Sequence, residues 1–455
     1  MQFKAKSQKL ILIAALSIST PLFAVDLIGV HDLAIKNDPR LQAAAYRRDA
    51  TGENTKQAWS NLLPLLTGGV GRTWGDSETN ISGTDSFPDI KSKTDIDTET
   101  WRIDLRQSLY NQGNYETLGV ARGQVSQADA IYNIAHQDFL VRVAGNYFAV
   151  LTAKDGVIFA EAEEKALQRQ FEQAEQRFEV GLTAVTDVHE ARASYDNARA
   201  RAIVSRNTLA DTYEALYELT GQYFNDVDPL QDVLPMVRPS PDNPAEWLVI
   251  AMQHNPSVIA ASLGVDIADA TVRLQRSGHY PSLELVGSIS QFTNNKVALT
   301  GDFGDIRAIT DLVNDDKRIG LQLSVPIYQG GFVSSRTRQA RYTMNAVSED
   351  LDQQQRATVR QTNNAFRAVI AGIEQVGAFG QAMISAESAL NATQAGFEVG
   401  TRTIVDVLIA QQRYYQAQRE NSLARHTYTV DHLRLKAAAG VLAEEDLRKI
   451  NTILK

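Results

Sequence analysis

An internal duplication constrains the fold more than any other feature of the sequence. The segment 178–181, Phe-Glu-Val-Gly, recurs at 397–400, an offset of 219 residues. Upstream the offset changes only to 217, where Pro64 matches Pro281. Because a fixed offset over most of a chain marks repeated structural units, we expect two halves of about 200 residues with the same elements in the same order.

The duplication sets the domain boundaries. We assign residues 25–222 to the first structural repeat and residues 246–440 to the second. Residues 223–245 are expected to form a linker, because they hold five of the chain's 12 prolines and proline interrupts regular structure. Residues 441–455 then form a C-terminal segment.

The N-terminus has the pattern of a secretory signal. Lys4, Lys6 and Lys9 precede the apolar run 10–18, and Ala24 is a small residue at a plausible cleavage point. Residues 1–24 are therefore predicted to be a signal peptide, with a buried N-terminal helix as the alternative. No other apolar run reaches the ~18 residues of a transmembrane helix. The pattern predicts an exported protein that no helix anchors.

Composition excludes several classes of function. The 455 residues include no cysteine, which excludes disulfides, thiolate metal sites and an N-terminal lipid-modified cysteine. A formal net charge of -9 argues against a general nucleic-acid binder. None of the seven histidines falls in an H-E-x-x-H motif, and there is no nucleotide loop or Gly-x-Ser-x-Gly. We therefore expect no enzymatic activity, no cofactor and no bound metal.

Each repeat is expected to contain a very long helical hairpin, at residues 113–221 and 331–439. The 66 residues from Gly113 to Phe178 include no proline, and as one helix they would extend about 99 Å. Small and apolar residues recur there at alternating steps of three and four, which is coiled-coil spacing. An ordinary antiparallel bundle would explain this seam equally well, but not the length. The seam positions in the first repeat are 118, 121, 125, 128, 132, 135 and 139, then 188, 191, 195, 198, 202, 205, 209, 212, 216 and 219. In the second repeat they are 407, 410, 414, 417, 421, 424, 428, 431, 435 and 438, at an offset of 219 from the last ten.

Strand patterns lie between the helices, with polar loops expected at 75–98 and 293–316. In the clearest strand, Ile319, Leu321 and Leu323 alternate with polar or small residues. This alternation fits a half-buried soluble sheet and a water-filled barrel in lipid equally well. A strand length of about ten residues, with aromatic residues at the ends, favours the barrel. The predicted strands are 64–74, 100–110, 282–292 and 317–328, and the aromatic residues are Trp74, Trp101, Phe292 and Tyr328.

Four strands are too few for one chain to form a barrel. A sheet in lipid must close on itself, because an open edge leaves backbone groups unpaired. Closure needs about eight or more strands, so several chains must contribute. Two chains would supply eight strands and three would supply 12, and a channel for sizeable cargo favours the larger number.

Two further segments carry a family resemblance. The run 399–408, Val-Gly-Thr-Arg-Thr-Ile-Val-Asp-Val-Leu, and the run 324–331, Ser-Val-Pro-Ile-Tyr-Gln-Gly-Gly, resemble the TolC family of outer-membrane efflux ducts. The resemblance covers essentially all of the mature chain. It implies a mixed α+β membrane protein, a homotrimer whose 12-stranded β-barrel receives four strands per chain. The barrel would continue into a long α-helical coiled-coil barrel in the periplasm, with an equatorial belt formed by residues 223–245 and 439–455.

The resemblance also implies a function. It indicates the outer-membrane exit duct of a tripartite efflux pump or type I secretion system, passive and gated at its periplasmic tip. Its partners would be outer-membrane lipid, a periplasmic adaptor protein and an inner-membrane transporter of RND, ABC or MFS type, with no nucleic acid. The alternative is an exported structural or surface coiled-coil protein without transport, which the strand pairs and the acidic turn disfavour.

Site residues follow by position in the matching motifs. The resemblance assigns adaptor docking to two hairpin turns and a periplasmic gate to the residues beside them. Asp406 matches the family's constriction carboxylate and Arg402 the arginine that holds the aperture closed. Two residues depart from the family pattern: Phe397 replaces a tyrosine, and Ile409 replaces a second aspartate. The docking residues are Gly181, Leu182, Thr183, Gly400, Thr401 and Arg402; the gate residues are Asp406, Arg402, Thr186, Asp187, Phe397 and Ile409.

Overall fold

The computed structural model describes residues 24–82, 90–299, 306–309 and 312–455. The predicted signal peptide, apart from Ala24, lies outside the described residues. The helices are α1 Leu27–Asn37, α2 Pro39–Ser60, α3 Gln112–Glu179, α4 Val185–Thr220, α5 Pro244–His254, α6 Pro256–Arg276, η1 Ser277–His279, α7 Phe332–Glu398, α8 Ile404–Ala439 and α9 Glu444–Asn451. The strands are β1 Leu65–Ile81, β2 Ile90–Asn111, β3 Ser282–Leu299, β4 Ile306–Ile309 and β5 Leu312–Ser324.

The duplication is visible element by element. Helices α1 and α5 each have 11 residues, and α4 and α8 each have 36. The N-caps of α2 and α6 are equivalent residues, Asp38 and Asn255, and each is followed by a proline at the first helical position. The side chains of both residues accept a backbone hydrogen bond from the first turn, which is what an N-cap requires.

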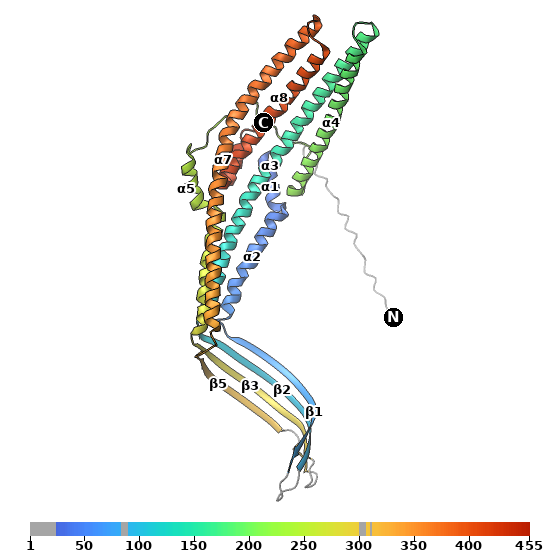
Figure 1. Ribbon diagram of the computed structural model, residues 1–455. Coiled ribbons are helices and arrows are strands. Elements are labelled where there is room, and N and C mark those ends of the chain that lie inside the picture. The colour runs from blue at the N-terminus through green and yellow to red at the C-terminus, as the bar shows by residue number, and fades with distance from the viewer. Residues whose placement is uncertain (1–23, 83–89, 300–305, 310–311) are drawn as a thin grey trace, which may run out of the picture.

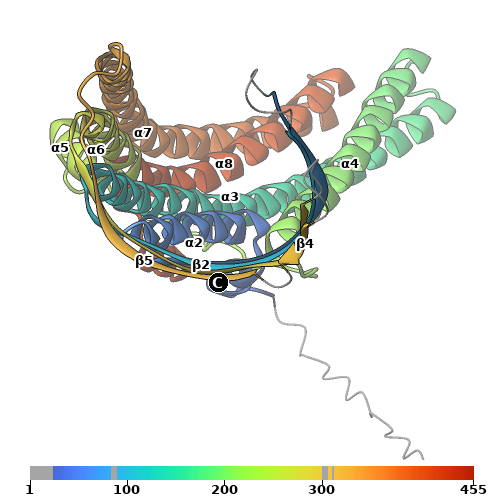
Figure 2. The ribbon, with the colours of Figure 1, turned by 90° about the horizontal axis from the view of Figure 1, so that it is seen from below.

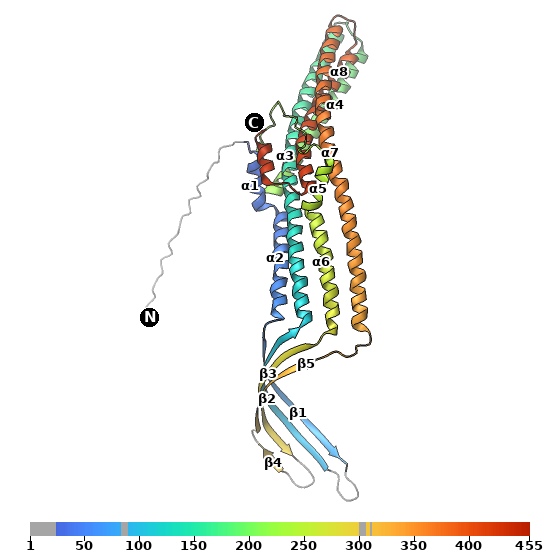
Figure 3. The same cartoon turned by 90° about the vertical axis from the view of Figure 1, so that its left-hand side faces the viewer.

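The molecule is long and narrow, with the sheet at one end and two helical hairpins at the other (Figure 1). Next to the sheet, α2, α3, α6 and α7 pack side by side in that order (Figure 3). Beyond the middle, α2 and α6 are replaced by α4 and α8, so the order becomes α4, α3, α8, α7. The length is possible because α3 and α7 run through both halves, with 68 and 67 residues.

The helical seams pack as predicted. Among the predicted seam positions of α3, α4 and α8 no residue is exposed, and Ala191, Ala198 and Ala202 are completely buried. Alanine lets two helix backbones approach closely but buries little apolar area per residue. Each hairpin therefore depends on its neighbours for stability.

The sheet is antiparallel and curved, in the order β1, β2, β3, β5, with the short β4 paired to the end of β3 (Figure 2). Its register puts most apolar residues of the four long strands on one face, with Leu65 and Val286, which pair with Arg106, as exceptions. Ile103 pairs with Ile289, and Leu285 pairs with both Gln107 and Leu321. Arg102 and Arg106 lie on the opposite face, where Arg106 Nε is 3.7 Å from Glu284 Oε2. The part of the sheet nearer the helices thus has one largely apolar face and one largely charged face.

The strands extend further than the sequence indicates, and the predicted loops are correspondingly too long. β1 continues to Ile81 and β2 begins at Ile90, within the predicted loop 75–98. β3 reaches Leu299 and β5 begins at Leu312, within the predicted loop 293–316. Strand pairing depends on backbone hydrogen bonds, which continue after the hydrophobic alternation ends. At its other end β5 stops at Ser324, before Pro326, and Tyr328 lies in the connection to α7.

The largest hydrophobic core lies near the middle of the molecule, where the linker and both termini of the described chain meet the long helices. The backbone of Val25 bridges Val227, and that of Leu230 bridges Leu454. The hydroxyl of Tyr147 on α3 donates to the carbonyl oxygens of Val25 and Asp228, at 3.2 and 2.9 Å. The linker, α1 and α9 thus form one layer on α3 and α8.

No single described helix has both the length and the apolar character that a bilayer crossing requires. Helices α5 and α6 reach both only when they are joined across the 43° bend between them.

Candidate gate and docking site at the hairpin tips

The two hairpin turns have the same backbone geometry. Gly181 has φ of 77° and Gly400 has φ of 79°, a left-handed conformation that residues with a Cβ rarely adopt. In both turns a backbone N–H reaches back over the glycine to the helix. Leu182 N donates to Arg177 O, and Thr401 N donates to Gly396 O, each at 2.8 Å. These bonds form the C-terminal cap that ends α3 and α7 and lets the chain reverse.

The two tips lie at the end of the molecule farthest from the sheet (Figure 1), and both expose apolar side chains. Val180 and Val399, at equivalent positions, are 68% and 76% exposed, and Leu182 is 73% exposed. The other predicted docking residues are also exposed, except Thr183, which is half-buried. A hydrophobic side chain at such a position costs free energy in water, and this cost is relieved when a partner covers it.

Asp406 begins α8 as part of a capping box. Its Oδ2 accepts from the N–H and the hydroxyl of Thr403, both at 2.9 Å, and Thr403 Oγ1 accepts from Asp406 N. The N–H of Thr403, followed by its hydroxyl, lowers the pKa of the Asp406 carboxyl. The carboxylate is therefore held ionised and in a fixed orientation at the helix N-terminus.

The equivalent carboxylate in the first hairpin is held differently. Asp187 Oδ2 accepts from the Thr183 hydroxyl, and Ala184, the N-cap of α4, provides no side-chain cap. Thr186 is exposed beside it. The gate residues Thr186 and Asp187 thus lie together at the start of α4, as their adjacency requires.

Arg402 is exposed at the second tip. Within the part of the chain that the structure describes, its guanidinium forms no ion pair, and it contacts neither Thr186 nor Asp187. The contacts by which Arg402 is expected to hold the aperture closed, here called the latch, are therefore not made within one protomer.

Phe397 has a partner that the sequence did not reveal. Its ring lies under the guanidinium of Arg177, 4.7 Å from the ring centroid to Cζ. Arg177 lies in the last turn of α3 and Phe397 in the last turn of α7, so this cation–π contact joins the two hairpins near their tips. The tyrosine expected at 397 would have supplied a hydroxyl; the phenylalanine supplies a ring face instead. Ile409, the second departure, is 43% exposed and lines a groove between α4 and α8.

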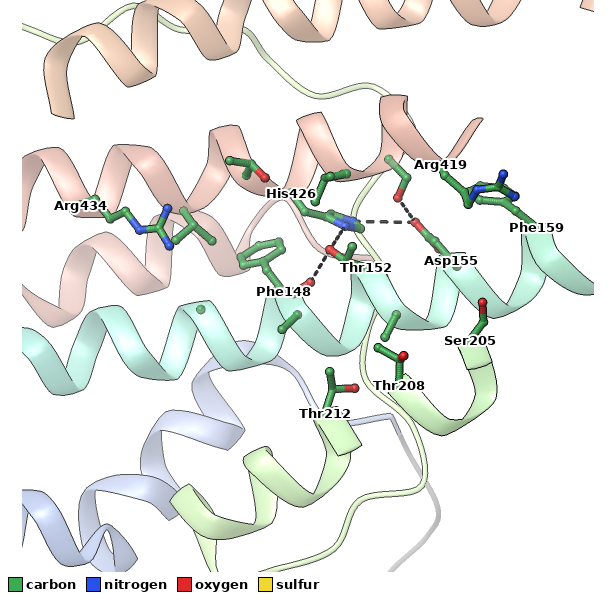
Figure 4. A pocket seen from close by; sticks show the side chains of 18 residues that line it. Phe148, Thr152, Asp155, Phe159, Ser205, Thr208, Thr212, Arg419, His426 and Arg434 are labelled. Atoms are coloured by element: carbon green, nitrogen blue, oxygen red, sulfur yellow. Dashed lines mark hydrogen bonds and ion pairs between the residues drawn. The ribbon is translucent and has the colours of Figure 1, made fainter. Parts of the chain in front are cut away.

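A cavity of about 470 Å³ lies closer to the middle, between α3, α4 and α8 (Figure 4). His426 of α8 points to Thr152 and Asp155 of α3: Nδ1 is 2.9 Å from Thr152 Oγ1, and Nε2 is 4.0 Å from Asp155 Oδ2. Ser422 donates to the same carboxylate. Burial lowers the pKa of His426 to about 4, despite the opposing effect of Asp155. The imidazole is therefore neutral in the folded protein at neutral pH.

This histidine should make stability fall in mild acid. The unfolded chain protonates His426 near pH 6.5, whereas the folded chain resists protonation until about pH 4. Between these values the unfolded state binds more protons, so the free energy of unfolding should fall by about 3 kcal/mol per chain as pH decreases. Unfolding temperatures of wild type and His426→Gln across this range provide the measurement. The wild type should lose more stability than the variant; parallel curves would contradict the assignment.

The comparisons with known proteins agree with this architecture. The family model described as outer membrane efflux protein matches residues 30–222 and 247–441, one match in each half. The chain is 37% identical to outer membrane protein TolC of Vibrio cholerae over 96% of each chain. It is 30% identical to the alkaline protease secretion protein AprF of Pseudomonas aeruginosa, over 94% of this chain and 87% of that one.

A solved structure supports the fold independently of sequence. The Campylobacter jejuni CmeC outer membrane channel matches with a TM-score of 0.73 at 16% identity, over 94% of this chain and 90% of that one. The predicted fold class, a trimeric β-barrel continuous with a helical periplasmic barrel, is confirmed. The chain therefore belongs to the outer membrane efflux protein family, and its relatives include the TolC proteins.

Proposed function

We propose that this chain forms a trimeric outer-membrane exit duct for efflux and secretion whose periplasmic entrance is closed at the hairpin tips. The observation that carries the proposal is that the two ends of the molecule differ. A curved sheet with one apolar face stands at one end, and exposed hairpin tips with a fixed carboxylate stand at the other. The related proteins are named for an outer membrane location and for secretion, so the alternative of a structural protein without transport has no support.

Ion conductance in planar bilayers tests the duct. The purified trimer should carry a steady current, and heat-dissociated protein should carry none. A trimer that stays non-conducting, both as wild type and with its gate residues replaced, would contradict the proposal.

Arg402 is proposed to latch the entrance between protomers. Its guanidinium has no ion-pair partner in the described part of its own chain, and Asp187 retains a carboxylate oxygen that Thr183 does not occupy. The helix order within one copy is α4, α3, α8, α7. When three copies close a ring in this order, helix α7 and its turn meet α4 of the next copy. Arg402 of one copy would then face Thr186 and Asp187 of its neighbour. Charge-assisted hydrogen bonds of this type are stronger than neutral ones.

Asp406 is proposed to form a ring of three carboxylates at the narrowest point. Like charges around a narrow axis focus a negative potential that attracts cations. The capping box keeps each carboxylate ionised, because hydrogen bonds to the charged form favour that form. Ile409 cannot add a second ring, so this entrance carries only one.

Asp406→Asn should weaken block of the single-channel current by divalent cations. Loss of about 1.4 kcal/mol of cation binding would raise the half-blocking concentration about tenfold. Asparagine still accepts a hydrogen bond from Thr403, so the start of α8 should remain folded. Thr403→Ala is the matched control: it removes the cap but keeps the charge, so block should persist. Unchanged block in Asp406→Asn would remove Asp406 from the gate.

The tips are proposed to dock a periplasmic adaptor that connects the duct to an inner-membrane transporter. The exposed Val180, Leu182 and Val399 support this role, because a hydrophobic surface at the end of a long soluble segment is favourable only when covered. The duct itself is proposed to be passive, with energy supplied by the transporter. Crosslinking of the tips to adaptor proteins in cells would identify which partner binds.

A further inference from the structure

Glu163 is a charged residue that neither the gate nor the docking tips use. It lies on α3 between the mid-molecule core and the tips, and its side chain is completely buried. Its Oε1 accepts from Arg201 Nη2 of α4 at 2.7 Å, and its Oε2 accepts from Arg419 Nη1 of α8 at 3.0 Å. Removing one partner of such a buried charge is strongly unfavourable, so the three side chains depend on one another. Glu163 therefore joins the two hairpins of one protomer.

The duplication provides an internal comparison for this ion triad. At an offset of 219, Glu163 corresponds to Ala382, Arg201 to Glu420, and Arg419 to Ala200. The second hairpin has helices of nearly the same lengths and the same turn, although alanine replaces Glu163 and glutamate replaces Arg201 there. Hairpin folding therefore does not require the triad, which instead marks the contact between α3 and α8.

Two kinds of seam exist in the distal half of the trimer. Within a protomer, α3 lies against α8; between protomers, the helix order α4, α3, α8, α7 brings α7 next to α4 of the following copy. The positions equivalent to Glu163 and Arg419 at the second seam are Ala382 and Ala200. A buried charge network thus secures the first seam, and small apolar residues occupy the second.

Empty space lies on either side of the triad. Arg419 lines the 470 Å³ cavity between α3, α4 and α8 (Figure 4), and Arg201 lines the groove of about 320 Å³ between α4 and α8 nearer the tips. The two hairpins are therefore incompletely packed at these levels. Between these two spaces, the ion triad is the polar contact that connects α3 with α4 and α8.

We propose that Glu163 fastens α3 to α8, so that the entrance widens at the seams between protomers while the seam within each protomer stays closed. This inference rests on the proposed function of a gated duct. Glu163, Arg201 and Arg419 are positioning residues, because they act on the helices that carry the gate and do not face it themselves.

Conductance of Arg419→Gln tests the fastening. This substitution removes the link to α8 but leaves the pair between Glu163 and Arg201 inside the first hairpin. The seam between α3 and α8 within each protomer could then also open, so the resting conductance should rise several-fold. Glu163→Gln should raise the resting conductance in the same way. The matched control is Glu164→Gln, because within the described residues Glu164 forms an ion pair with Arg206 of α4, at 3.7 Å, and none with α8. If both variants conduct like wild type while the unlatched tip variant Arg402→Ser conducts strongly, this inference is wrong but the proposed duct still stands.

Distances measured between spin labels test the same inference without any current. The chain has no cysteine, so Gln168→Cys on α3 and Gln412→Cys on α8, both exposed, can be labelled specifically. The distribution of the shortest distance between labels should be narrow, and the same, in wild type and in Arg402→Ser. It should be broader after Arg419→Gln. Broadening in the unlatched variant alone, or no broadening after Arg419→Gln, would overturn the inference even if no variant conducts.

Discussion

Arg402→Ser should raise the resting conductance of the trimer by about tenfold or more. Each guanidinium is proposed to hold the neighbouring protomer through charge-assisted hydrogen bonds, which are worth about 1.5–3 kcal/mol each in other proteins. Losing only about 1.4 kcal/mol of closed-state contact shifts the opening equilibrium tenfold. Serine keeps a small polar side chain at the exposed turn, and the backbone bond from Arg402 N to Gly396 O does not depend on the side chain.

Arg413→Ser is the matched control for this variant. Arg413 is an exposed arginine of α8, the helix that follows the turn, and, like Arg402, has no ion pair in the described part of the chain. It lies away from the turn, so its removal changes the charge by the same amount without touching the proposed latch. Equal conductance of the two variants would mean that Arg402 acts only through net charge.

The gate has fewer restraints at this tip than the family pattern implies, and the structure indicates what replaces them. Phe397 cannot form the expected hydroxyl bond, but its ring receives Arg177. Ile409 removes one carboxylate ring, so Asp406 carries the proposed cation site alone. The contacts between the two hairpins of one protomer include this ring contact and the Glu163 triad, whose carboxylate is completely buried.

The helical architecture could be predicted from the sequence because it follows from repetition and periodicity. The offset of 219 residues relates both turns and both long hairpins, and the steps of three and four identify the seams. The caps at Asp38 and Asn255 were readable from a single residue before proline. Patterns of this kind depend on neighbours in the sequence, which the sequence itself displays.

Contacts between distant elements could not be read in the same way. Arg177 and Phe397 are far apart in sequence, and Arg177 resembles any charged residue at a helix C-terminus. Glu163 lies in the segment 161–164, Glu-Ala-Glu-Glu, where the other two glutamates are exposed or half-buried. The one sequence signal is recognisable only once the structure is known: the position equivalent to Glu163 in the second repeat is Ala382, so this charge is not part of the repeated pattern. The strand ends were missed for a related reason, because backbone pairing outside the apolar band has no side-chain pattern.

Gly440→Ala should destabilise the protein by about 4 kcal/mol per chain and lower the yield of folded trimer. Gly440 ends α8 with φ of 77°, where a Cβ costs about 1–2 kcal/mol. A Cβ there would also lie 2.3 Å from His254 O and 2.5 Å from Asn255 Cα. Backbone cannot yield as a flexible side chain does, so the junction of α5 and α6 must shift, at a further cost of about 1–3 kcal/mol. That shift would also strain the bond from Asn255 Nδ2 to Ala438 O, 2.8 Å long.

Gly221→Ala is the control that the duplication provides. Gly221 ends α4 with φ of 68°, and Asn37 Nδ2 donates to Thr220 O at 2.8 Å, a bond like that of the second half but with donor and acceptor each shifted by one residue. A Cβ on Gly221, however, would approach nothing closer than 3.7 Å, the distance to Asn37 Cβ. This variant should lose only the conformational cost of about 1–2 kcal/mol. Thermal dissociation of both trimers measures the difference; equal losses would mean that backbone conformation, not the contact between α8 and the α5–α6 junction, sets the cost at Gly440.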